Sequence, residues 1–191
     1  MNEAMNVPYS QFCAALAKPG AAIVAAMTPE KAHMLHMAVG LSGEAGEALS
    51  AINQHIHFEK ELDRVNLIEE RGDLEFYAEG LRQACGLPVA AVGSSANPEN
   101  YGFHGVMLSV DAADLLDAVK KHVIYNKPLD ADLVEDKLLG LHFEMGCVRV
   151  LLGVSREEVI AANKQKLGVR YSSGSYSDKQ AQDRADKKEI Q

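Results

Sequence analysis

Two short acidic motifs give this chain its candidate chemistry. The first pairs Glu44 with Glu47 in a run of small and apolar residues, and the second pairs Glu70 with Asp73. On an α-helix, residues three positions apart lie about 60° apart around the axis, with Cβ atoms about 5–6 Å from each other. Each motif therefore directs two carboxylates to one place.

The spacing of the two motifs predicts that they meet. Residues 44 and 73 are centred on the same point of the chain as residues 47 and 70. If the chain folds back at residues 57–60 as a helical hairpin, four carboxylates form one cluster. Like charges on facing helices repel each other unless a cation lies among them, and carboxylate oxygens suit Mg²⁺ or Mn²⁺. The sequence therefore predicts a divalent metal site made by Glu44, Glu47, Glu70 and Asp73.

These motifs resemble the ExxE and ExxD signature of the all-α NTP pyrophosphohydrolases, the MazG-like group. The resemblance lies in residues 40–47 and 67–77. A third segment, residues 163–171, is similar to the N-x-x-K-L-x-x-R-Y segment that closes many members of the group. The likeness covers about residues 30–85 and 155–185.

The resemblance implies a Mg²⁺-dependent enzyme that converts a nucleoside or deoxynucleoside triphosphate to the monophosphate and pyrophosphate. The four acids would hold the metal, and Glu47 is the first choice for the general base. Lys166 and Arg170, with Asn163 nearby, would contact the phosphates of the substrate. Members of the group assemble as dimers or tetramers, so a homo-oligomer is expected.

Two alternatives to this function stay open. A pyrophosphohydrolase acting on a phosphoribosyl-nucleotide intermediate of histidine synthesis uses the same layout of carboxylates. A non-catalytic helical interaction module would carry the acidic cluster only as a solvated face. Lys166 and Arg170 can likewise be part of a solvated face, because cations are favoured near a helix C-terminus in any case.

Composition narrows the class of protein. The chain has 191 residues, of which 47% are hydrophobic and 24% charged, and its net charge of −8 argues against a protein that grips a nucleic acid backbone. Three widely spaced cysteines show no zinc-binding pattern, which indicates reduced thiols and a cytoplasmic location. The apolar run at residues 21–27 is too short to span a bilayer, so no membrane partner or targeting segment is expected.

Start and stop signals predict an all-α bundle of antiparallel helix hairpins in one domain, residues 1–171. A short helix that ends at Pro19-Gly20 is expected to pack on the main body. Thr28-Pro29 begins a catalytic hairpin over about 29–86, and residues 93–102 form a linker or a lid. A second hairpin follows over about 109–153, and Ser155 and Glu158 form a capping box. Residues 172–191 form a polar tail that is expected to be mobile.

The second hairpin resembles a worn copy of the first. A turn centred on Lys127 would pair Asp117 with Lys137 and Asp114 with Gly140. This pairing predicts an internal pseudo-repeat in which only the first hairpin keeps the metal site. Chance similarity between two amphipathic hairpins is the alternative.

Overall fold

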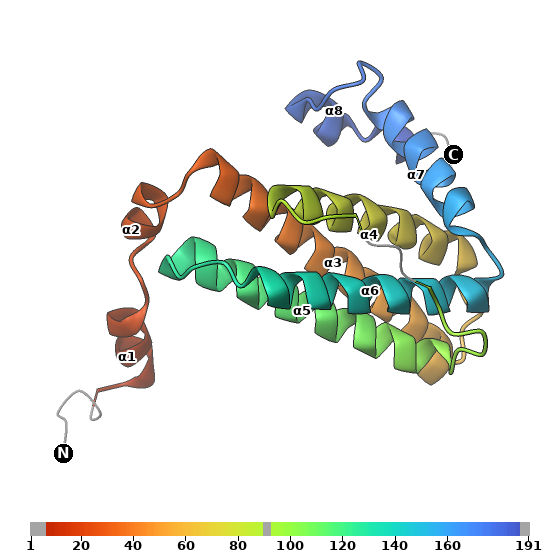
Figure 1. The fold of residues 1–191 in the computed structure, drawn as a ribbon, viewed down its shortest axis with the longest axis horizontal. Helices are drawn as coiled ribbons and strands as arrows, with labels where there is room; N and C mark the ends of the chain where they lie inside the picture. The colour runs from red at the N-terminus through yellow and green to blue at the C-terminus, as the bar shows by residue number, and fades with distance from the viewer. Residues whose placement is uncertain (1–6, 90–92, 188–191) are drawn as a thin grey trace.

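The computed structural model describes residues 7–89 and 93–187, and both ranges are helical without a strand (Figure 1). The prediction of an all-α bundle is therefore confirmed. No single helix in these ranges is long and apolar enough to cross a membrane, and only α6 and α7, which meet at 96°, reach that length and hydropathy as a bent pair. The elements are α1 (Tyr9–Leu16), α2 (Gly20–Ala25), α3 (Pro29–Phe58), α4 (Arg64–Ala84), α5 (Tyr101–Tyr125), α6 (Ala131–Leu152), α7 (Arg156–Arg170), α8 (Asp178–Asp183) and the 3₁₀ turn η2 (Ala185–Lys187).

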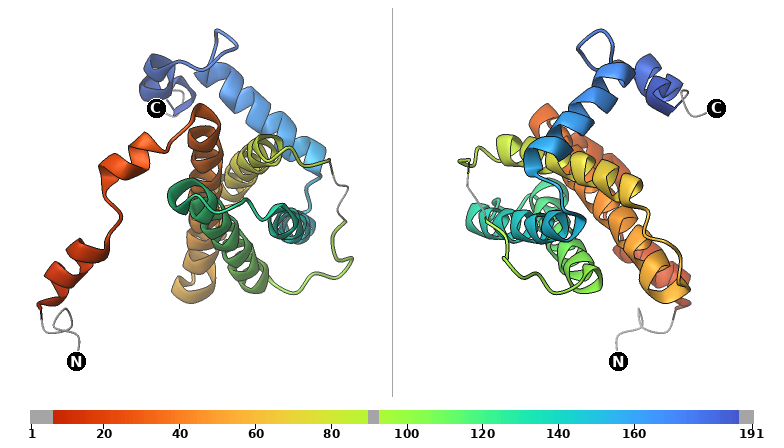
Figure 2. Two further views of the ribbon diagram at one scale, coloured as in Figure 1. Left: turned by 60° about the vertical axis from the view of Figure 1, so that its left-hand side comes forward. Right: turned by 90° about the vertical axis from the view of Figure 1, so that its right-hand side faces the viewer.

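Helix α3 is the central element of the bundle. It packs against both α4 and α5, and α5 packs in turn on α6 (Figures 1 and 2). The Thr28 side chain accepts a hydrogen bond from the Lys31 backbone N at 3.3 Å, so α3 begins where its sequence signals place it. It ends at Glu59, which adopts a left-handed conformation with φ of 53°.

Two close contacts fix how α3 lies along α4. A Cβ atom at Gly40 would be 2.2 Å from Cε1 of Tyr77, and one at Gly80 would be 2.3 Å from Sδ of Met37. Each glycine therefore makes room for a large side chain of the facing helix. The contact pairs 40–77 and 37–80 have the same midpoint in the sequence as the acidic pairs 44–73 and 47–70. The two helices thus run in opposite directions in the register that brings the two acidic motifs level.

Helix α5 begins eight residues earlier than the sequence suggests, since its first residue is 101 rather than about 109. Its N-cap is Asn100, whose side chain accepts a hydrogen bond from the Phe103 backbone N at 3.0 Å. Gly102 and Gly105 in its first turns lower helix propensity and disguise the start. Gly105 lets α5 approach α3, because a Cβ atom there would be 2.8 Å from Cδ1 of Ile52.

The pairing predicted for the second hairpin is wrong by about one helical turn. Lys137 pairs with Asp111 at 3.2 Å and with Asp114 at 2.8 Å, and not with Asp117. Asp117 instead pairs with lysines of its own helix. Gly140 lies beside Asp111 rather than Asp114, because a Cβ atom at Gly140 would be 2.7 Å from Oδ2 of Asp111.

The connection between α5 and α6 is centred before Lys127, where the prediction placed it. Asn126 ends α5 in a left-handed conformation, and the carbonyl of Lys127 then lies 2.8 Å from Nδ1 of His122. The chain therefore runs back beside the last turn of α5 before α6 begins. A turn centred on Lys127 does not allow for that return.

The first two helices form an N-terminal arm, residues 9–25, that leads away from the bundle (Figures 1 and 2). Neither helix contains a buried residue, so the expectation that the first helix packs on the main body is not met. Tyr9, Leu16 and Val24 are 80%, 69% and 74% exposed. The arm thus presents apolar side chains that its own bundle does not cover.

The C-terminal segment forms ordered elements over the residues that the structure describes. Helix α7 starts with the predicted capping box of Ser155 and Glu158, and it ends at Arg170. In the polar tail, which was expected to be mobile, α8 and η2 follow, and Asp186 forms an ion pair with Arg170 at 2.6 Å. The last four residues of the tail, 188–191, lie outside the described ranges.

Candidate metal centre

Three of the four predicted metal ligands come together between α3 and α4. Glu44, Glu47 and Glu70 each offer one carboxylate oxygen, and these oxygens lie within 4.8 Å of one another. Glu70 is buried, Glu44 is partly buried and Glu47 is exposed. The acidic cluster, as we call these three residues, therefore reaches from the α3–α4 interface to solvent.

The carboxylates of the acidic cluster strongly affect one another. Burial raises the pKa of Glu44 to about 8, and a hydrogen bond with Glu70 and the negative charges of Asp73, Glu70 and Glu47 act in the same direction. Burial also raises the pKa of Glu70, against the opposing effects of the bond with Glu44 and the charge of Lys166. Without a cation, the cluster therefore keeps a proton near neutral pH.

Asp73, the fourth predicted ligand, points its carboxylate towards α7. Its Oδ1 accepts a hydrogen bond from Nδ2 of Asn163 at 2.8 Å, and its Oδ2 forms an ion pair with Lys166. Its charge still raises the pKa of Glu44, so it adjoins the acidic cluster. The sequence places Asn163 and Lys166 near the site but does not reveal that both contact Asp73.

A buried ion pair network holds α7 against α4. Glu75 is only 6% exposed, and its carboxylate pairs with Arg156 of α7 at 2.7 Å and with Arg149 of α6 at 3.2 Å. Asn163 lies directly on Gly72, where an added Cβ would be 2.7 Å from Cβ of Asn163. These contacts set the position of α7 over the acidic motif of α4. No periodic pattern in the sequence predicts them.

Arg170, the third residue predicted to bind substrate, is already paired. Its Nε and Nη2 donate to Oδ1 and Oδ2 of Asp186 at 2.7 and 2.6 Å, and this carboxylate raises the pKa of the guanidinium. With both of these hydrogen bonds made, Arg170 still lies on the wall of a cavity beside the acidic cluster. Its partner comes from the tail, for which the sequence predicts no role.

The cavity beside the acidic cluster has a volume of about 670 Å³, which is within the usual range for a small-molecule site. Glu44 and Asp73 form part of its wall. The ring of Tyr77 meets the ring of His36 edge to face at 6.0 Å, and Tyr171 lies 5.7 Å from Tyr176. The wall thus combines carboxylates with aromatic rings and cations: His36, Phe76, Tyr77, Tyr171, Tyr176, Arg156, Lys164 and Arg170.

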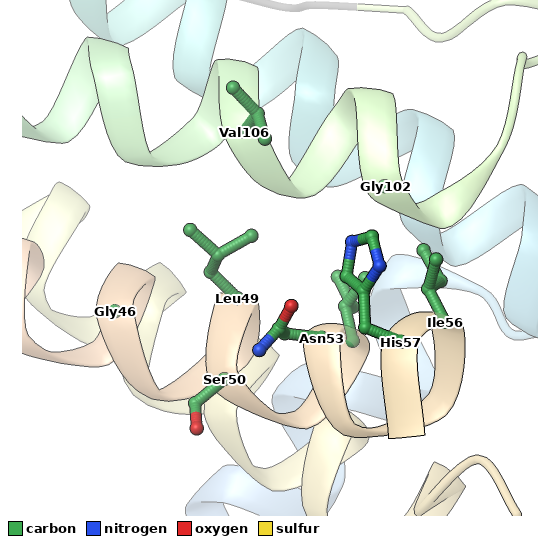
Figure 3. A pocket seen from close by; sticks show the side chains of 9 residues that line it. Gly46, Leu49, Ser50, Asn53, Ile56, His57, Gly102 and Val106 are labelled. Carbon is green, nitrogen blue, oxygen red and sulfur yellow. The ribbon is translucent and has the colours of Figure 1, made fainter. Parts of the chain in front are cut away.

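A second cavity of about 430 Å³ lies between α3 and α5 (Figure 3). Leu49 and Ile56 of α3 and Val106 of α5 line it, and no carboxylate does. It differs from the acidic cluster in its chemistry, because its lining is mainly apolar. We call it the α3–α5 groove.

One further group has metal-ligand composition, but its atoms already have partners. His104, Glu144 and Cys147 are buried together, with one atom of each within 4.8 Å of the others. Nδ1 of His104 lies 2.6 Å from Oε2 of Glu144, and its Nε2 accepts a hydrogen bond from the Glu99 backbone N at 3.0 Å. Both ring nitrogens are therefore occupied, and the group is a buried hydrogen-bond network.

The fold and the site together define an all-α protein with a carboxylate cluster at the edge of an aromatic and cationic cavity. Comparisons with protein families, curated proteins and solved structures find no match to this chain. Its function is therefore inferred from the geometry of the site.

Proposed function

We propose that the protein is a Mg²⁺-dependent pyrophosphohydrolase that converts a nucleoside or deoxynucleoside triphosphate to the monophosphate and pyrophosphate. One observation carries the proposal: the acidic cluster adjoins a cavity whose wall holds aromatic rings and cations. Carboxylates suit a divalent metal, aromatic rings suit a planar base and cations suit phosphates. The resemblance of the acidic motifs and the closing segment to the MazG-like group supports the same function.

The acidic cluster fits Mg²⁺ or Mn²⁺ by the chemistry of its donors. Three carboxylate oxygens within 4.8 Å of one another are hard ligands, and Glu44 is half-protonated only at about pH 8 because burial and its neighbours disfavour its charge. A divalent cation would remove that repulsion. Glu44, Glu47 and Glu70 would hold it, with Asp73 beside them. When bound, Mg²⁺ supplies positive charge for phosphate oxygens and acidifies a water molecule.

The remaining roles fall to side chains around the cluster. Glu47 is the exposed member of the three glutamates, so it can reach a water molecule and accept its proton as general base. Asn163 donates to Asp73, and the Asp73 carboxylate holds the side chain of Lys166 beside the cluster, where its ammonium can meet an oxygen of the leaving pyrophosphate. Lys164 and Arg170 lie on the cavity wall and can contact the other phosphates.

A substrate panel tests the proposed function. All common NTPs and dNTPs, and a phosphoribosyl-ATP substrate, are incubated with the protein and Mg²⁺, and pyrophosphate and monophosphate are measured. The expected result is equimolar release of both products from a subset of the triphosphates, and none in excess EDTA. Turnover of the phosphoribosyl compound alone would favour the alternative pyrophosphohydrolase. An interaction module would release nothing and gain no thermal stability from Mg²⁺ plus nucleotide.

Lys166→Ala is expected to raise KM for the nucleotide about tenfold, because a charge-assisted contact to phosphate is lost. Since the variant also removes the cation that pairs with Asp73, we expect tighter Mg²⁺ binding. Separate titrations of Mg²⁺ and nucleotide distinguish the two effects. Lys179→Ala is the matched control, because Lys179 is an exposed lysine of α8 outside the cavity wall. Unchanged kcat/KM in Lys166→Ala would leave Lys166 only as a structural partner of Asp73.

We also propose that the chain forms a homo-oligomer in which the N-terminal arm of one copy lies in the α3–α5 groove of another. The arm exposes Leu16 and Val24, and neither of its two helices contains a buried residue, although Lys18 between them donates a hydrogen bond to the Ile124 carbonyl of α5. The groove exposes Val106, which is 50% exposed and lies across from Leu49, and Ile56 lines the same groove nearer to Gly102 (Figure 3). Both surfaces are apolar and each lacks a cover within the described residues.

Leu16→Asp and Val106→Asp test this assembly from both sides. Each should shift the protein towards the 20.7 kDa monomer in sedimentation at micromolar concentration, because each places a charge in the apolar contact. Val65→Asp is the control, since Val65 is 73% exposed at the start of α4 and belongs neither to the arm nor to the residues that line the groove. A wild-type protein that sediments as a clean monomer would reject the assembly.

A further inference from the structure

The turns of the two hairpins are built in the same way. In the first, Nδ1 of His55 lies 2.9 Å from the carbonyl of Lys60, and in the second Nδ1 of His122 lies 2.8 Å from the carbonyl of Lys127. The residue before each lysine is the only left-handed residue of its turn, with φ of 53° and 54°. The two sets of residues, 55 to 60 and 122 to 127, are 67 positions apart.

The helix ends on either side of these turns repeat at the same distance. Asp63 caps α4 by accepting from the Asn66 backbone N at 3.0 Å, and Asp130 caps α6 by accepting from the Leu133 backbone N at 3.1 Å. Residues 63 and 130 are again 67 positions apart. Gly86 after α4 and Gly153 after α6, also 67 positions apart, both turn the chain, with φ of 68° and 65°.

The buried faces of the helices agree with this offset. Residues 67 positions apart occupy equivalent core positions, and both members of each pair are buried. Such agreement across four helices is not expected of two hairpins that share only amphipathic character. The pairs are Leu41 with Leu108, Ala45 with Ala112, Ile52 with Val119, Leu67 with Val134, Leu74 with Leu141, and Leu81 with Val148.

The same offset relates the acidic cluster to a cluster in the second hairpin. Glu44 corresponds to Asp111, Glu47 to Asp114 and Glu70 to Lys137. Nζ of Lys137 lies 3.2 Å from Oδ1 of Asp111 and 2.8 Å from Oδ2 of Asp114. Two acids at equivalent positions therefore surround an ammonium group in the second hairpin, where the first hairpin has a third carboxylate.

We infer that α5–α6 is a second copy of α3–α4 in which Lys137 takes the place of a divalent cation, so that the chain binds metal at one of two equivalent positions. The inference rests on the proposed function for the identity of the ligand at the first position. A lysine supplies positive charge permanently, whereas a metal must be bound from solution. Asp111 is only 7% exposed and needs such a partner to stay charged in the core.

Lys137→Glu combined with Gly140→Asp restores the acids of the first hairpin in the second. The three atoms nearest to a Cβ atom added at Gly140 all belong to the carboxylate end of the Asp111 side chain and none to the backbone, so the position can accept a side chain once Asp111 shifts. We expect the variant to bind one more equivalent of Mn²⁺ per chain than the wild type in calorimetric titration. Lys121→Glu is the control for the Lys137→Glu exchange: it makes the same lysine-to-glutamate change at an exposed lysine of α5 and should add no equivalent.

Glu70→Lys makes the reciprocal exchange in the first hairpin. A lysine at this position should pair with Glu44 and Glu47 as Lys137 pairs with its two aspartates. The variant is therefore expected to fold, to bind no Mn²⁺ and to show a Tm without metal at or above that of the wild type. Its Tm should no longer respond to Mg²⁺.

The two exchanges separate this inference from the proposed function. If the wild type binds Mn²⁺ and the well-folded double variant of the second hairpin binds no more, the second hairpin is not an equivalent site and the inference is overturned. If the wild type binds none and the double variant binds one equivalent, Lys137 does take the place of a cation in the second hairpin, but metal binding at the first position and the proposed function fail. Should the double variant not fold, Glu70→Lys decides, because a Tm well below that of the metal-free wild type contradicts the equivalence.

Discussion

Replacing Glu47 with glutamine is expected to reduce pyrophosphate release about 10²- to 10⁴-fold, because the variant lacks the residue that we propose as general base and metal ligand. The fold should be unaffected or slightly more stable. The charge of Glu47 helps to raise the pKa of Glu44, so its removal relieves repulsion in the metal-free cluster. Initial rates at saturating Mg²⁺ and thermal unfolding in EDTA measure the two effects.

Glu61→Gln is the matched control for this substitution, because Glu61 is an exposed glutamate of the α3–α4 connection. It should have wild-type activity. Near wild-type pyrophosphate release from Glu47→Gln would remove Glu47 from the reaction.

Asp73→Asn should also lose activity, but with the opposite effect on stability. Asp73 is paired with Lys166, which is 13% exposed in its side chain, and the amide would leave that ammonium without a charged partner. Its Tm in EDTA should therefore fall while that of Glu47→Gln does not. A Tm for Asp73→Asn at or above the wild type would mean that the ion pair with Lys166 does not stabilise the fold.

Local signals in the sequence predicted most helix boundaries correctly. Thr28 before Pro29 and the Ser155–Glu158 capping box both cap the helices they were expected to cap. Each of these interactions spans only three residues, so it depends little on the rest of the fold. The start of α5 was missed because its cap, Asn100, is followed by glycines that serve contact with α3 and not helix propensity.

The turn of a hairpin sets the register of its two helices. The register of the first hairpin was easier to predict from the sequence than that of the second. In the first hairpin, four carboxylate residues in two equally spaced pairs show directly where in the sequence the midpoint of the hairpin lies. In the second hairpin, the facing residues are two aspartates and a lysine, and the predicted midpoint of the hairpin was too far along the chain. The repeated His-x₄-Lys spacing at residues 55–60 and 122–127 carries the correct centre, because both histidines close the same turn.

Contacts between distant segments could not be obtained from the sequence. Glu75 joins α4 to Arg149 and Arg156, and Asp186 of the tail neutralises Arg170. These partners are 16 to 81 residues apart in the chain. Neither hydrophobic periodicity nor capping signals constrain which charged side chains meet over such separations. The approach of Glu44, Glu47 and Glu70 to one another was therefore predictable from the sequence, whereas the orientation of Asp73 towards α7 was not.

The stability of the metal-free protein is expected to fall as pH rises from about 4.5 to 8. The pKa of Glu44 is raised from its ordinary value of 4.5 to about 8 in the folded state, mainly by burial. In that range the folded state binds a proton that the unfolded state has released, so raising the pH favours unfolding. Because Glu44 is only partly buried, solvent screening limits the effect to on the order of 1–2 kcal/mol.

Mg²⁺ should reverse this dependence, because a bound cation replaces the proton and favours the charged carboxylates. At 100 times its Kd, Mg²⁺ adds about 2.7 kcal/mol, which corresponds to a rise in Tm of roughly 5–10 °C for a chain of this size. We expect the rise to be small at pH 5.5, where protons compete, and full at pH 8.5. Thermal unfolding across this range with Mg²⁺ or EDTA measures it, with Glu44→Gln expected to lose most of the pH slope and Glu61→Gln to keep it. A Mg²⁺ effect that is equal at both pH values, or absent at both, would contradict metal binding at the acidic cluster.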